Sequence, residues 1–158
     1  MAKRNLPEIR VRKVRQPRVE MPSPEKPNFH GEEGEVLAGT VNGMKASAPE
    51  ERLFRALKKN PKVQGMEFRY TIGAPRGLPG WKEVDYLVAS LGLVYAIEVD
   101  TAFTHRGKKE SDRLHDAIVL NALRQQGLNV YPSVIHLDGE SELVDQKNAD
   151  TTVRRMFG

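Results

Sequence analysis

The chain has 158 residues, a formal net charge of +4 and no cysteine. This length is typical of one domain with an appendage, and a chain without cysteine has neither a disulfide framework nor a thiolate metal site. No apolar run approaches the roughly 20 residues that a membrane-spanning helix needs, and no apolar core follows the basic N-terminus, as a secretory signal would require. We therefore expect no membrane partner, and a location in the cytoplasm.

Residues 1–45 have the composition of an extended arm followed by a glycine-rich linker. Five of the ten prolines lie before Asn28, and the eight basic and three acidic residues there give this part a charge of +5, so that the remainder carries about −1. Because proline fixes φ and removes a backbone donor, we expect little helix or sheet in residues 1–30. Such an arm is typical of a segment that follows a phosphate backbone or docks on a protein assembly, and a solvated, disordered tail is the alternative. The arm residues expected to contact nucleic acid are Arg10, Arg12, Lys13 and Arg15.

A first helix is predicted to begin after Ser47 and to end at Asn60. Ser47 is suited to the N-cap, and Glu50 completes a capping box. Glu51 lies one turn before Arg55, which is compatible with a surface ion pair. The alternative is that Glu50 or Glu51 points towards a catalytic site.

Three strands should follow. Residues 66–72 alternate between apolar and polar, which predicts a half-buried strand. A loop rich in glycine and proline comes next and contains Arg76, for which we expect a phosphate contact or simple solvation. Residues 81–88 and 93–100 then read as two strands that pair as a hairpin across the turn at Gly92.

These two strands each carry an acid among apolar neighbours, Asp85 in the first and Glu98 in the second. A buried carboxylate is costly without a partner, and two carboxylates on adjacent strands repel and raise each other's pKa unless a cation lies between them. Oxygen ligands of this kind suit a hard divalent metal. The sequence therefore predicts a site for Mg²⁺ or Mn²⁺ at this pair.

A polar and basic segment follows Asp100. Its Arg106, Lys108 and Lys109 are expected to clamp the phosphates of a nucleic acid, with a solvated charge run as the alternative. His105 has the chemistry of a general base or proton shuttle. A helix over residues 110–126 would place Asp116 near its start, where it could orient His105 or a metal-bound water.

The remaining segment is predicted to be a strand over residues 129–135, with Pro132 favouring an edge position. The order helix, three strands, helix, strand predicts an α/β domain over residues 46–138, with a mixed central sheet flanked by helices. No glycine-rich phosphate loop follows a strand, which disfavours doubly wound nucleotide-binding folds. Residues 139–158 are expected to form a polar C-terminal tail, with a short helix over residues 151–158 as an alternative for its end.

The order of several short motifs resembles the PD-(D/E)XK nuclease superfamily, and within it the branch of the very-short-patch-repair endonucleases. The matching positions are Asp85, the segment Ile97-Glu98-Val99-Asp100, His105, Asp116, Leu123 and Gly127-Leu128-Asn129-Val130. The resemblance covers roughly residues 47–137 and implies a restriction-endonuclease-like fold that hydrolyses phosphodiesters of DNA with Mg²⁺ or Mn²⁺. It implies the catalytic residues Glu51, Asp85, Glu98, Asp100 and His105. The implied metal ligands are Asp85, Glu98 and the carbonyl of Val99.

The chain departs from that pattern at three positions. The usual lysine two residues after the glutamate is Asp100, the common glycine after it is Thr101, and the arginine expected on the second helix is Val119. A histidine can take over from the lysine in the branch that the chain resembles. The other two changes leave open an alternative: a weak or inactive nuclease fold that serves as a structural component of a larger assembly, located within a virion or nucleoprotein particle. Residues 1–30 would then bind the assembly partner.

Overall fold

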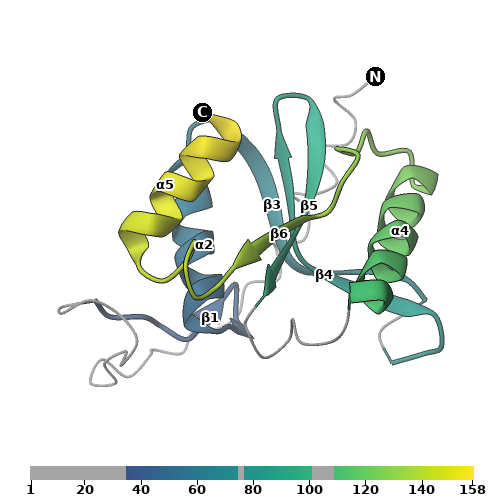
Figure 1. Cartoon of the computed structure of the whole chain (residues 1–158), viewed down its shortest axis with the longest axis horizontal. Coiled ribbons are helices and arrows are strands. Elements are labelled where there is room, and N and C mark those ends of the chain that lie inside the picture. Colours follow the sequence, from purple (N-terminus) through teal and green to yellow (C-terminus); the bar gives the residue numbers. More distant parts are fainter. Residues whose placement is uncertain (1–34, 75–76, 101–108) are drawn as a thin grey trace.

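The computed structural model describes residues 35–74, 77–100 and 109–158 (Figure 1). Within these ranges the protein is a mixed α/β domain, in which a four-stranded mixed sheet is accompanied by three helices. None of the helices in the described part is both long and apolar enough to cross a membrane.

The central sheet has the strand order β3-β4-β5-β6. Its strands are β3 Val63–Gly73, β4 Trp81–Ser90, β5 Leu93–Asp100 and β6 Ile135–Asp138. The first three pair antiparallel, whereas β6 pairs parallel with β5. The predicted hairpin is confirmed: Ser90 pairs with Leu93, and Leu91 and Gly92 both have positive φ, as the tightest hairpin turns require.

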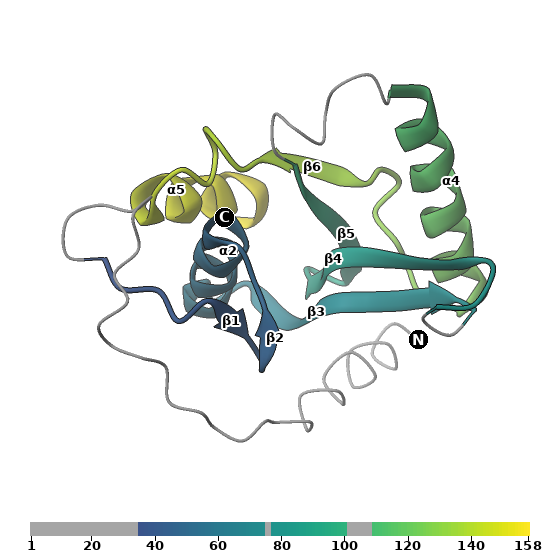
Figure 2. The same cartoon turned by 90° about the horizontal axis from the view of Figure 1, so that it is seen from below.

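Helices cover both faces of this sheet. α2 Ala48–Lys59 and α5 Gln146–Phe157 lie on one face, and α4 Lys109–Gln125 lies on the other (Figures 1 and 2). The predicted capping box of the first helix is confirmed, since Ser47 and Glu50 exchange hydrogen bonds between side chain and backbone. The hydroxyl of Tyr86 in β4 donates to the carbonyl of Glu50 at 2.9 Å and so ties α2 to the sheet.

The expected polar tail over residues 139–158 is wrong. Residues 146–157 form α5, which packs beside α2 and contributes Ala149, Val153 and Phe157 to the core. Leu143, just before α5, is fully buried, and its carbonyl accepts a hydrogen bond from the buried guanidinium of Arg52 at 3.0 Å. Ala149, Val153 and Phe157 are four positions apart along α5, which is an amphipathic pattern. The average composition of the segment is polar and does not reveal it.

Two further boundaries differ from the expectation. The last strand starts at Ile135 instead of residue 129, and Val130 makes only an isolated bridge to Val94. The part of the chain assigned to the linker contains a small hairpin, β1 Thr40–Val41 with β2 Met44–Lys45. Val41 is 1% exposed and belongs to the core, so the domain begins earlier than residue 46.

The strands β4 and β5 part at one point, which we call the fork. Their pairing runs from Ser90 and Leu93 to Tyr86 and Ile97 and stops there. Beyond it, the first residues of β4 pair with β3, whereas the last residues of β5 pair with β6. In Figures 1 and 2 the two strands run apart from this point. Asp85 and Glu98 are the residues next to the last paired positions, so both acids lie at the fork.

Candidate functional site

The two strand acids meet at the fork. Asp85 accepts the backbone N–H of Val99 through Oδ2 at 2.8 Å, which turns its carboxyl group towards β5. Burial and, after it, the nearby Glu98 carboxylate, which also exchanges a hydrogen bond with Asp85, together raise the pKa of Asp85 to about 8. At neutral pH the pair therefore holds a proton unless a cation takes its place.

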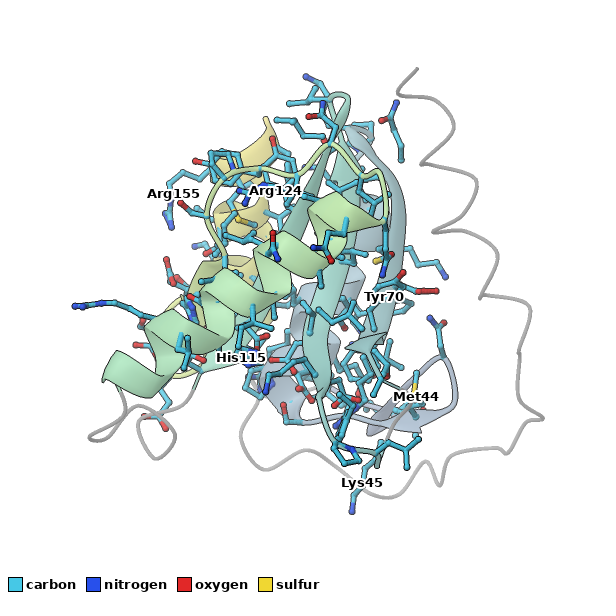
Figure 3. The ribbon with its side chains drawn as sticks, turned by 90° about the vertical axis from the view of Figure 1, so that its right-hand side faces the viewer. Met44, Lys45, Tyr70, His115, Arg124 and Arg155 are labelled. Atoms are coloured by element: carbon cyan, nitrogen blue, oxygen red, sulfur yellow. The ribbon has the colours of Figure 1, made fainter. Side chains whose placement is uncertain are left out.

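Glu98 has an unmet hydrogen-bonding capacity. Its Oε2 is buried and has no hydrogen-bond partner among the described residues. Among the described residues, His115 on α4 lies close by, with Nε2 at 3.8 Å from this oxygen. Figure 3 shows His115 on the foreground helix, alongside the sheet. The interaction with Glu98 raises the pKa of His115, against the opposing effect of burial.

A histidine that the sequence did not single out joins two more acids beside this pair. His136 in β6 lies with Nδ1 at 2.8 Å from Oδ2 of Asp100 and with Nε2 at 2.7 Å from Oδ2 of Asp116. Its pKa is raised to about 9, mainly by the hydrogen bond to Asp100. At neutral pH both ring nitrogens thus carry protons and donate to the two carboxylates. We call the group Asp100, Asp116 and His136 the histidine clamp.

The strand alternation explains why these side chains gather on one face. Ala96 packs in the core under α4, whereas Ile97 packs in the core under α2 and α5. Because successive side chains in a strand alternate, Glu98 and Asp100 share the α4 face with Ala96. The parallel register pairs Glu98 with His136, which brings the histidine to the same face.

The strand next to β4 is strained at the level of Asp85. Arg69 has a φ of 57°, between the pairs Phe68 with Tyr86 and Tyr70 with Val84. A positive φ at a non-glycine residue costs on the order of 1–3 kcal/mol and is common at functional sites. Phe68 and Tyr86 pack under α2 and α5, whereas Tyr70 and Val84, their neighbours two residues along β3 and β4, pack under α4. Side chains two residues apart share one face of a regular strand, so both strands are irregular here. The fork lies where this irregularity opens β4 away from β5.

Glu51, expected in the catalytic set, has a structural role instead. It is 3% exposed, and its two carboxylate oxygens accept the N–H groups of Ala38 and Gly39 at 2.9 and 2.8 Å. Arg55 adds an ion pair at 3.0 Å. The acid of α2 whose negative charge raises the pKa of Asp85 is Glu50. Its side chain also accepts the N–H of Ser47 in the capping box of α2.

Several other candidate residues lie outside the described part of the chain. They are Arg10, Arg12, Lys13, Arg15, Arg76, His105, Arg106, Lys108 and the side chain of Lys109. Asp116, expected to orient His105, is bound to His136 in the described structure. The described part of the site is therefore made of four acids, Asp85, Glu98, Asp100 and Asp116, and two histidines, His115 and His136.

The site offers a metal ion only a few side chains that could act as ligands. Among the residues that the structure describes, no group of three or more histidine, aspartate or glutamate side chains is arranged to hold a metal. The ligand set expected from the sequence has only two such side chains, Asp85 and Glu98, together with the carbonyl of Val99. The orphaned Oε2 of Glu98 and the raised pKa of Asp85 both indicate a place where a cation would offset an electrostatic cost.

Comparison with known proteins gives a distant likeness. No family model matches the chain, and no curated protein matches it. The crystal structure of protein VC1899 from Vibrio cholerae is similar over 69% of this chain and 32% of that protein, with 13% sequence identity and a TM-score of 0.37. This chain thus spans about a third of the length of VC1899. The chain is similar, at this low level, to part of VC1899, and its function is inferred from the residues of its own site.

Proposed function

We propose that the protein is a divalent-metal-dependent endonuclease of the PD-(D/E)XK superfamily and hydrolyses phosphodiester bonds in DNA. The observation that carries this proposal is the acid pair at the fork, where Asp85 has a pKa of about 8 and Glu98 keeps a buried oxygen without a hydrogen-bond partner in the described part of the chain. The order of the acids along the chain, and their meeting on two adjacent strands, are what that superfamily would require.

The acid pair works against folding in the metal-free protein. Two partly buried carboxylates repel, and replacing such a group with a neutral one often stabilises a fold. The carboxylate of Glu51, by contrast, accepts hydrogen bonds from two backbone N–H groups and forms an ion pair with an arginine. Apart from the hydrogen bond between Asp85 and the N–H of Val99, the pair costs stability, which is typical of residues kept for function.

Each group of the site has a role in such a reaction. A bound Mg²⁺ or Mn²⁺ would supply Lewis acidity and lower the pKa of a water molecule. Asp85, Glu98 and the Val99 carbonyl would hold the ion, and the Val99 N–H keeps Asp85 oriented towards β5. His115, close to Glu98 and with a raised pKa, would offer positive charge to the scissile phosphate.

Cleavage assays with Glu98→Gln test this proposal. Purified protein with Mg²⁺ or Mn²⁺ should cut DNA, and Glu98→Gln should lower the rate by roughly 10²–10³-fold, since it keeps the volume of the side chain but removes a charge from the metal site. The matched control is Glu140→Gln, the same change at an exposed residue in the turn after β6, which should cut like the wild type.

The substrates for this assay should include duplex, single-stranded, branched and mismatched DNA. If the wild-type protein cuts none of them with either metal, the enzymatic proposal is contradicted. The alternative of an inactive component of a larger assembly would then be preferred. Its proposed tether, residues 1–30, lies outside the described residues, so no observation in the structure favours it now.

A further inference from the structure

We propose that His136 is a positioning residue: the histidine clamp docks the first turns of α4 on the sheet and thereby sets His115 beside Glu98. This inference rests on the proposed nuclease function, because it assigns a role in that same site. It begins from the two short contacts of the His136 ring, 2.8 Å to Asp100 and 2.7 Å to Asp116.

The first part of the argument is how α4 is attached. The second half of the helix is held by buried apolar residues, Val119, Leu120 and Leu123. In its first half the apolar side chains face outwards, with Leu114 63% and Ile118 41% exposed. Apolar burial therefore fixes only the C-terminal half of α4.

In the first half of α4, the described side chains that reach the sheet are polar. Between residues 113 and 118 only His115 and Asp116 are partly covered, and both reach towards the sheet. Asp116 binds His136 at hydrogen-bond distance, whereas His115 stays 3.8 Å from Glu98. The shorter and stronger link is the one made by His136, so this link decides where the first turns of α4 lie.

The second part of the argument is the position of the clamp relative to the acid pair. His136 is the register partner of Glu98 in β6, and Asp100 lies two residues beyond Glu98 in β5. His115 precedes Asp116 on the helix, so that fixing Asp116 also fixes His115. Without the clamp, His115 would lose its defined place near the buried oxygen of Glu98.

Three substitutions of His136 separate the contacts. Asparagine places a donor near the position of Nδ1 and keeps the contact to Asp100, whereas glutamine reaches the position of Nε2 and keeps the contact to Asp116. Alanine removes both. Because the ring is 32% exposed, we expect all three variants to fold. If the alanine variant does not, the asparagine and glutamine pair still separates the two contacts.

For DNA cleavage, His136→Ala and His136→Asn should lower kcat by roughly 10- to 100-fold with little change in KM, as is common when a supporting contact of a site is lost. His136→Gln should restore most of kcat. A role in stability alone predicts instead that kcat follows the free energy of unfolding across the three variants, and that result would overturn the inference.

Amide hydrogen exchange tests the clamp without reference to activity. In His136→Ala and His136→Asn, exchange should accelerate in residues 113–118 and stay slow in residues 119–125, while His136→Gln should resemble the wild type. If exchange in the first half of α4 is unchanged in all variants, the clamp is wrong even if the protein cuts DNA. If the wild type does not cut DNA but exchange changes as expected, the proposed function fails and the docking role of His136 stands.

Discussion

Replacing Asp85 with asparagine is expected to stabilise the metal-free protein while it abolishes DNA cleavage. The pKa of Asp85 is about 8 in the folded protein, whereas a carboxyl group without interactions has a pKa of 3.8. Between about pH 4 and pH 8 the folded state therefore holds a proton that the unfolded state has released. The free energy of unfolding should therefore fall as pH rises from about 4 to about 8. Asparagine does not ionise and still accepts the N–H of Val99, so the variant should be more stable at pH 8 by on the order of 1–3 kcal/mol.

Urea unfolding with a chelator present at pH 5, 7 and 8.5 measures this effect. His136 contributes in the same direction, since its folded pKa of about 9 means that its stabilisation is complete below about 6.5 and lost as pH approaches 9. The difference between the wild type and Asp85→Asn removes that shared contribution. A variant that is less stable than the wild type at pH 8.5 would show that ionised Asp85 supports the fold.

Removing residues 139–158 is expected to unfold the protein. This segment supplies Leu143, Val153 and Phe157 to the core, and the Phe157 ring packs edge-on against Tyr95 with centroids 5.0 Å apart. Phe157→Ala alone should lower the free energy of unfolding by about 3–5 kcal/mol, because it leaves a cavity in the core. That is a large share of the 5–15 kcal/mol typical of a domain.

A matched pair of valines checks this prediction with smaller changes. Val153 is 1% exposed in α5, whereas Val144 is 40% exposed just before it. Val153→Ala should cost about 2 kcal/mol, and Val144→Ala should stay within about 0.5 kcal/mol of the wild type. Equal effects of the two substitutions, or a folded protein after truncation at residue 138, would contradict the packing of α5.

Local patterns predicted the elements whose signals are short-range. The capping box at Ser47 and the turn at Gly92 fix the start of α2 and the hairpin of β4 and β5. The full extent of α5 was missed because its core residues are separated by three mostly polar positions each, and the average composition hides that stripe. The start of β6 was missed because its pairing with β5 is parallel and distant in sequence, so no turn signal marks it.

The candidate site also has one part that local sequence patterns predict and one part that they do not. The meeting of Asp85 and Glu98 follows from hairpin pairing, which the sequence indicates. The role of His136 depends on the parallel register that places it opposite Glu98, and no local pattern carries that register. Glu50 and Glu51 are neighbours on α2 and point in directions about 100° apart around the helix axis. Which of them points towards the site depends on how the helix packs on the sheet.

Calorimetric titration with Mn²⁺ tests most directly whether Asp85 and Glu98 hold a cation. At pH 7 the wild type should bind Mn²⁺ at one site and release about one proton per ion, because binding needs Asp85 ionised. Glu140→Gln should bind in the same way, whereas Asp85→Asn and Glu98→Gln should bind at least about tenfold more weakly, and Asp85→Asn should release no proton. Equal Mn²⁺ binding by the wild type and Asp85→Asn, or no binding by the wild type, would contradict the account.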